Sequence, residues 1–142
     1  MALPTTLTLE IVTPDRSLIR EEVDEAVVPG SEGDFGVLPG HTPLLSMLRI
    51  GELWYRQGPE KHYLAVAFGF VEVLPDRVIV LAQVGERAQE IDVERAERAR
   101  RRAEERLAHP TPAADLDFER ARIAMMKSLI RLQVASRART RV

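Results

Sequence analysis

Apolar and polar residues alternate with the two-residue period of a β-strand through the first part of the chain. The segment LTLEIV at residues 7–12 alternates in this way, and Pro14-Asp15 then supplies a turn. Further strand-like runs, each bounded by Gly, Pro or Asp, follow at residues 24–30, 34–40, 44–58, 62–76 and 77–85. Gly58-Pro59 and Pro75-Asp76 are typical of hairpin turns. Many short strands at such spacing predict a β-sandwich or barrel near residues 5–85.

The period then changes to that of a helix. After Asp92, the small and apolar residues Ala96, Ala99, Ala103 and Leu107 recur at helical spacing, which predicts a helix over residues 93–109. Asp92 is expected to be its N-cap and Glu94 to lie in its first turn, because both favour the exposed amides there.

A second helix is predicted over residues 118–138, with its start at Asp115 or Asp117. Two prolines in the link HPTPAADLD separate it from the first, so the two helices are expected to form an antiparallel hairpin. The chain therefore divides into residues 1–87, an all-β module, and residues 88–142, a helical module.

The second helix carries more apolar surface than the thin alanine stripe of the first can cover. At about 25 cal/mol per Å2, leaving the surplus in water would forgo several kcal/mol. The surplus surface is therefore expected to meet the sandwich, another protein, or each in turn. Its apolar residues form two sides, one with Phe118, Ala121, Met125, Leu129 and Leu132, the other with Ile123, Met126, Ile130 and Val134.

Charge is distributed unevenly between the modules. The net charge of the 142 residues is −2, but residues 1–86 hold thirteen acidic and six basic side chains, while the remainder is basic. This asymmetry indicates two different partners. The chain has no cysteine, and no apolar stretch approaches the ~18 residues of a membrane span, so we expect neither disulfides nor membrane insertion.

The segment GDFGVLPGHTPLL at residues 33–45 is the densest group of glycine and proline in the chain. A phosphate-binding loop would need a lysine and a helix directly after it, and neither follows. His41, His62 and His109 lie on separate elements without metal-ligand spacing, and neither a cysteine nor a G-x-S-x-G segment supplies a nucleophile. The residues alone favour a loop histidine at position 41 whose ring bonds to local backbone.

Basic residues are concentrated on both predicted helices. In ERARRRAEER the arginines are interleaved with Glu94, Glu97, Glu104 and Glu105 at intrahelical pairing distance, which favours a solvated helix face over a nucleic-acid surface. On the second helix, Arg120, Lys127 and Arg131 fall within roughly 40° of one another, opposite Phe118 and Leu129. That stripe is either a solvated face or a site for a multivalent anion.

Four segments resemble the epsilon subunit of the F-type rotary ATP synthase. They are VVPGSEGDFGVLPGHTPLLSML at 27–48, FGFVEV at 68–73, IDVERAERARRRAEERL at 91–107 and RLQVA at 131–135. The match runs in order over almost the whole chain. One departure is Phe68, where the family often has a second glycine before Gly69.

The resemblance implies a sandwich of about ten strands followed by the two-helix hairpin. It implies a non-catalytic subunit of the rotor, without an active site of its own, that binds the gamma subunit and the c-ring through its sandwich. The c-ring contact would include Glu32, Asp34 and His41. The hairpin would regulate ATP hydrolysis by contacting the alpha and beta subunits in an inhibitory state, at the cytoplasmic face of a bacterial membrane.

The resemblance also implies ATP as a regulatory ligand, although no cofactor is required. Arginines of both helices, an I/L-D-x-x-R-A motif and a preceding acid would form the site, and Lys127 stands where the family has an arginine. The residues implied are Glu86, Ile91, Asp92, Arg95, Ala96, Arg120, Lys127 and Arg131. The N-cap role of Asp92 explains the same motif without a ligand. The alternative function is a free-standing sandwich whose basic hairpin binds an acidic protein or nucleic acid.

Overall fold

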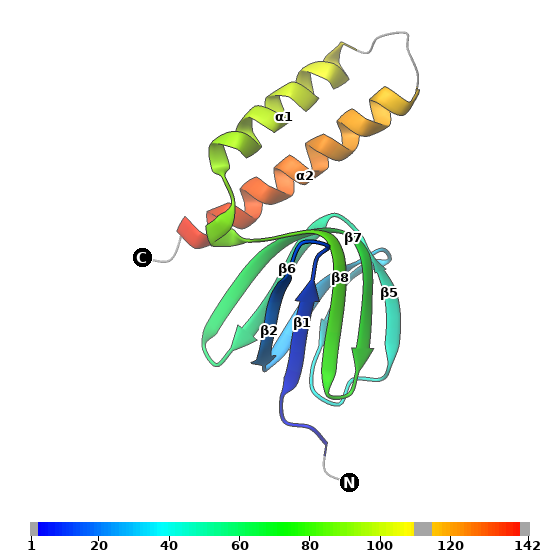
Figure 1. Cartoon of the computed structure of the whole chain (residues 1–142), viewed down its shortest axis with the longest axis vertical. Coiled ribbons are helices and arrows are strands. Elements are labelled where there is room, and N and C mark those ends of the chain that lie inside the picture. The colour runs from blue at the N-terminus through cyan, green and yellow to red at the C-terminus, as the bar shows by residue number, and fades with distance from the viewer. Residues whose placement is uncertain (1–2, 110–114, 140–142) are drawn as a thin grey trace. The chain divides into compact units, whose positions relative to one another are not determined.

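A computed structural model describes residues 3–109 and 115–139, and the chain divides into two units, Met1–Arg87 and Ala88–Val142 (Figure 1). The first unit is built of strands and the second of helices, as the change of period predicts.

The first unit contains eight strands joined in one hydrogen-bonded sheet. They are β1 (Leu7–Val12), β2 (Ser17–Val23), β3 (Glu25–Gly30), β4 (Gly33–Val37), β5 (Leu44–Leu48), β6 (Gly51–Gln57), β7 (Glu60–Leu74) and β8 (Arg77–Arg87). The sequence patterns predicted strands at all of these positions except β2, although β5 and β6 were predicted as one run over residues 44–58. The β2 segment SLIREEV does not alternate, since Leu18 and Ile19 are both buried and three exposed polar residues follow.

β5 and β6 together form one long hairpin with β7. β5 and β6 both pair with β7 in one continuous register, from Leu44 opposite Val73 to Gln57 opposite Glu60, where Gly58-Pro59 makes the predicted turn. Pro75-Asp76 makes the second predicted turn, between β7 and β8. The run at 44–58 is interrupted at residues 49–50, where the chain passes from one layer to the other.

The sheet folds over into two layers because its longest strands bend. One layer consists of β2, β1, β8, β7 and β5 in that order, and its β1 and β8 are parallel. The other layer consists of β4, β3 and β6 together with the halves of β7 and β8 that lie beyond the bend. The expected all-β sandwich is therefore confirmed, but the expectation of about ten strands is wrong as a count. β7 and β8 pass through both layers unbroken, so ten is reached only if each is counted twice.

The bend of β7 lies at Phe68 and Gly69, which both have positive φ, 56° and 133°. Phe68 thus adopts a backbone conformation that favours glycine, the residue that the resemblance implies at this position. Between the layers, alternate residues of the strands form a core of nineteen buried residues that includes Leu9, Val28 and Val71.

The second unit is a helical hairpin. Its elements are a short 3-10 turn η1 (Ala88–Glu90), α1 (Val93–Ala108) and α2 (Asp115–Arg139), with α1 and α2 antiparallel (Figure 1). Asp92 is the N-cap of α1 as predicted, because its Oδ1 accepts a hydrogen bond of 3.1 Å from the amide of Arg95. The predicted proline-containing link falls largely on residues 110–114, outside the described residues.

Small residues separate the two helices. Ala96 and Ala103 of α1 are buried, and so are Ala121, Ser128 and Ala135 of α2, all spaced by seven. The Ser128 hydroxyl donates to the carbonyl of Met125 at 2.8 Å, so its burial leaves no unpaired donor. α2 also packs on η1.

Candidate interaction surfaces

An uncovered apolar row crosses the outer face of the sandwich. Met47 of β5 is paired with Phe70 of β7, and Phe70 with Leu81 of β8, so the three side chains stand side by side on adjacent strands. They are 56%, 50% and 52% exposed. Leu45, two residues before Met47 and hence on the same face, is 70% exposed. A contiguous set of large apolar side chains of this kind is typical of a surface that another protein covers.

Gly69 fixes the geometry of this row. A β-carbon at Gly69 would overlap the backbone carbonyl of Leu81, so β7 and β8 approach more closely here than any other residue would allow. This close approach sets Phe70 directly against Leu81 across the two strands.

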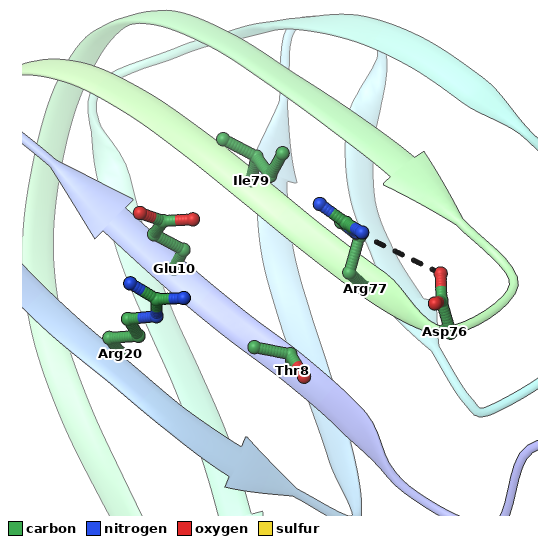
Figure 2. A pocket seen from close by; sticks show the side chains of 6 residues that line it. All are labelled: Thr8, Glu10, Arg20, Asp76, Arg77 and Ile79. Carbon is green, nitrogen blue, oxygen red and sulfur yellow. Dashed lines mark ion pairs between the residues drawn. The ribbon is translucent and has the colours of Figure 1, made fainter.

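Beside the apolar row, the same face carries an open polar depression of about 160 Å3 (Figure 2). Glu10 and Arg20 are opposite one another on β1 and β2, and Arg77 lies 3.9 Å from Asp76. Two cations and two anions share the depression, so it favours neither an anion nor a cation. Its lining residues are Thr8, Glu10, Arg20, Asp76, Arg77 and Ile79.

The buried phenol of the first unit has a perturbed pKa. The Tyr55 hydroxyl donates to Glu21 at 3.3 Å, and burial, followed by the nearby Glu21 carboxylate, raises the pKa of Tyr55 to about 12, while Arg87 opposes the shift. The shift moves the titration of Tyr55 away from neutral pH. Tyr55 therefore has a structural role here and is unsuited to acid-base chemistry at pH 7.

The three residues expected at the c-ring do not share one tip. Glu32 lies in the β3–β4 turn, where the neighbouring amide of Ser31 donates to Met47 near the end of β5. His41 follows Gly40, whose amide donates to Pro75 beside the start of β5. A strand length of about 13 Å therefore separates these anchor points. Asp34 is exposed and forms an ion pair with Arg49, and His41 Nδ1 donates to the Thr42 carbonyl at 2.6 Å, as the local-backbone interpretation predicts.

The helical hairpin has an apolar side that α1 leaves uncovered. Phe118, Met126 and Leu129 are 49%, 38% and 46% exposed. At about 100° per residue, they lie roughly 80–160° around α2 from the residues that face α1. The predicted surplus of apolar surface is therefore present, although Ala121 and Val134 from the two predicted sides are buried.

The opposite side of the hairpin is basic. On α2, Arg120, Lys127 and Arg131 lie about 60–100° from the buried residues, in the rotational sense opposite to Phe118. On α1, four exposed arginines form a row that we call the arginine stripe: Arg95, Arg98, Arg102 and Arg106. This stripe is displaced around α1 from the buried alanines in the same rotational sense as the α2 cations are displaced from the buried residues of α2. Because the two helices are antiparallel, the stripe and the α2 cations lie on the same side of the hairpin. We call this surface the basic side; it consists of Arg95, Arg98, Arg102, Arg106, Arg120, Lys127 and Arg131.

Intrahelical pairing neutralises fewer arginines of α1 than the sequence suggests. Arg100 pairs with Glu97 and Glu104, at 3.0 and 2.9 Å. Over the described residues, the four arginines of the stripe have no ion pair, and the ion pairs of α1 are those of Arg100. The sequence interpretation of a salt-bridged face is thus correct for Arg100 and wrong for the stripe.

The residues implied for ATP are only partly brought together. Arg95 in the first turn of α1 and Arg131 in the second half of α2 lie toward the same end of the antiparallel pair, and Lys127 is about one turn from Arg131 along α2. Arg120 is eleven residues from Arg131, about 16 Å along α2. Ile91 and Ala96 are buried and serve packing, Asp92 caps α1, and Glu86 belongs to the first unit.

Among the described residues, neither helix is long and apolar enough to cross a membrane. The same residues hold no group of three or more acidic, histidine or cysteine side chains placed to bind a metal ion.

Comparison with known proteins gives matches over nearly the whole chain. The family model of the β-sandwich domain of the ATP synthase delta/epsilon chain matches residues 6–88, and that of its long α-helix domain matches residues 89–136. The chain is 50% identical over 131 residues to ATP synthase epsilon chain 2 of Syntrophotalea carbinolica, covering 92% of this chain and 94% of the relative. It is also 50% identical over 129 residues to the ATP synthase epsilon chain of Syntrophobacter fumaroxidans, covering 91% and 95%.

Among solved structures, a chain of the Euglena gracilis mitochondrial ATP synthase, in its OSCP/F1/c-ring assembly, matches with a TM-score of 0.80. It is 21% identical, and the match covers 98% of this chain and 84% of that one. A chain of the Tetrahymena thermophila central stalk and c-ring matches with a TM-score of 0.60 at 13% identity. These likenesses show the shared fold. None of the comparisons supports the alternative of a free-standing sandwich that binds nucleic acid or an acidic protein.

Proposed function

The chain belongs to the ATP synthase delta/epsilon chain family, and from this membership we propose that it is a non-catalytic subunit of the central stalk of an F-type ATP synthase. In this role it couples proton flow to ATP synthesis and regulates ATP hydrolysis. It has no active site of its own in this proposal, and the complex holds it at the cytoplasmic face of the membrane.

The observation that carries the proposal is the apolar row Met47, Phe70 and Leu81. Each side chain is about half exposed, and covering the exposed half of each contributes roughly 1 kcal/mol, or about 3 kcal/mol for the row. The partner we assign to this row is the gamma subunit. Co-expression of the two chains tests the assignment: we expect them to purify together in equal amounts. Quantitative recovery of this chain without gamma would contradict it.

The c-ring contact is proposed for the polar surface around Glu32, Asp34 and His41. Since Glu32 and His41 are anchored at the two ends of β5, a ring that touches both must contact the surface along β4 and β5. Cysteines at positions 34 and 41 should crosslink to c subunits in the assembled enzyme. If both positions crosslink only to the catalytic head, the sandwich is oriented opposite to the way proposed here.

The regulatory role is proposed for the helical hairpin, residues 88–142. Its interface is narrow because it is made of alanine and serine, while Phe118, Met126 and Leu129 remain exposed on α2. These side chains suit a second docking partner, for which we propose the alpha and beta subunits in an inhibitory state. Deletion of residues 88–142 should then raise ATP hydrolysis by the assembled enzyme and leave its assembly intact.

ATP is proposed as the ligand that favours the non-inhibitory state, bound at the end of the basic side formed by Arg95, Lys127 and Arg131. A ligand shifts such a balance only through its different affinities for the two states. Titration calorimetry of the full chain with ATP should show binding that Arg95→Ala weakens about tenfold or more. Absence of heat at millimolar ATP would remove this part of the proposal.

A further inference from the structure

The arginine stripe of α1 is unusual because its charges are exposed and unpaired along the whole helix. Arg95, Arg98, Arg102 and Arg106 are exposed, and in the part of the chain that the structure describes none of them has a carboxylate within ion-pair distance. Each guanidinium therefore keeps its planar set of donors for an external anion. Arg100 and Arg122 differ, since each is held by a glutamate of its own helix.

The geometry of the stripe is linear. At 1.5 Å per residue, Arg95 and Arg106 are about 16 Å apart along the axis, and the four side chains fall within about 80° of arc. Glu94 and Glu105 border the stripe on the side away from α2. An anion is thereby confined to a strip that runs the length of the hairpin, with the α2 cations Arg120, Lys127 and Arg131 along its other edge.

We propose that the basic side binds a linear polyphosphate. Such a chain repeats its charge along one line and has no apolar part, which matches a stripe that has no exposed large apolar residue among its arginines. This site is longer than the end at which ATP is proposed to bind. It uses Arg98, Arg102 and Arg106, which the ATP proposal does not require.

Other polyanions match this surface less well. Sites for single-stranded nucleic acid carry aromatic side chains on which bases stack, and α1 has none, while Phe118 lies on the opposite side of the hairpin. A helix that lies on an anionic membrane buries a large apolar face of its own, whereas the buried residues of α1 are the alanines Ala96 and Ala103. A protein partner would be anchored by apolar side chains at the centre of the contact, and the stripe offers none.

Calorimetric titration of the full chain with inorganic polyphosphate, repeated at several salt concentrations, tests the proposal. Four or more neutralised phosphates predict that log K falls with log salt with a slope of about −3 or steeper. The double variant Arg98→Ala/Arg102→Ala should bind about tenfold more weakly or worse, with a slope shallower by roughly 1.4. Alanine is the best helix former, so the double variant should retain the helical circular dichroism of the parent.

The matched control is Arg122→Ala, which removes an arginine of the same hairpin that is paired with Glu119 and lies off the basic side. Its affinity and salt slope should equal those of the parent. An equal loss in the control and the double variant would overturn the proposal. So would tripolyphosphate or ATP binding as tightly as the long chain with the same slope, and so would binding to phosphatidylglycerol vesicles without binding to polyphosphate.

Discussion

Gly69 of β7 lies so close to Leu81 of β8 that a β-carbon at position 69 would overlap the Leu81 carbonyl oxygen. The side chain of Leu81 points outward at this point and stands beside Phe70. This close backbone approach therefore lies directly beside the apolar row that we assign to gamma.

Replacement of Gly69 should be costly for the first unit. Gly69→Ala combines a positive φ with a backbone overlap, so we expect a loss of about 3 kcal/mol or more in the free energy of unfolding, measured with denaturant. Gly36→Ala is the matched control, because its β-carbon would meet Val27 at an ordinary 4.0 Å. It should change stability by less than about 1 kcal/mol. Equal losses of stability in the two variants would show that the close approach of Gly69 to Leu81 does not determine the cost of a side chain at position 69.

The fragment of residues 1–87 should fold alone. The nineteen residues of its core all lie between Leu7 and Ala82, so the core is complete without the hairpin. We expect the fragment to unfold cooperatively and to bind gamma, while hydrolysis by an enzyme assembled with it is no longer regulated. A fragment that is unfolded in circular dichroism would show that the helices are part of the folding unit.

Asp92 allows its capping role to be separated from a role in ATP binding. Asp92→Ala removes the acceptor for the Arg95 amide and should destabilise the hairpin by about 1 kcal/mol. Asp92→Asn keeps an equally good cap and removes the negative charge. If the Asn variant matches the parent in both helix stability and ATP affinity, Asp92 is a cap alone. A loss of ATP affinity with unchanged stability would instead assign its carboxylate to the ligand.

Tyr55 makes the stability of the first unit depend on alkaline pH. Its pKa is raised from the ordinary 10.0 to about 12, chiefly by burial, so the folded state favours the neutral phenol. The contribution, roughly 2–3 kcal/mol, is complete below pH 10 and is lost as the pH rises toward 12. Denaturant unfolding between pH 9 and about 12 should show this loss in the parent and in Tyr63→Phe but not in Tyr55→Phe. The same loss in Tyr55→Phe would assign it to another group.

The sequence predicted the features that depend on local periodicity and chemistry. The strands and turns around β7, the Asp92 cap and the two helices follow from alternation, Gly-Pro and Pro-Asp pairs, and helical spacing. β2 was missed because Leu18 and Ile19 are buried in succession, which hides the alternation. The resemblance overestimated the strand count because only the fold shows that β7 and β8 bend through both layers.

The interaction surfaces were harder to predict because they depend on register between distant segments. Met47, Phe70 and Leu81 become a row only through pairing across three strands, and no local pattern joins them. The apolar surplus of α2 was visible in its sequence. The unpaired stripe on α1 was not recognised, because the glutamates at pairing distance from its arginines suggested neutralisation. Among the described residues, the ion pairs of that helix all involve Arg100.

The affinity of the full chain for gamma is the most direct test of the central claim, that the apolar row of the sandwich binds the rotor shaft. Phe70→Asp and Phe118→Asp change the same residue type at nearly equal exposure, 50% and 49%, in different units. Titration of gamma with each variant should show a loss of about thirtyfold or more for Phe70→Asp, the size typical of an aromatic hot spot, and less than about twofold for Phe118→Asp. Unchanged affinity in Phe70→Asp, or an equal loss in both variants, would contradict the account.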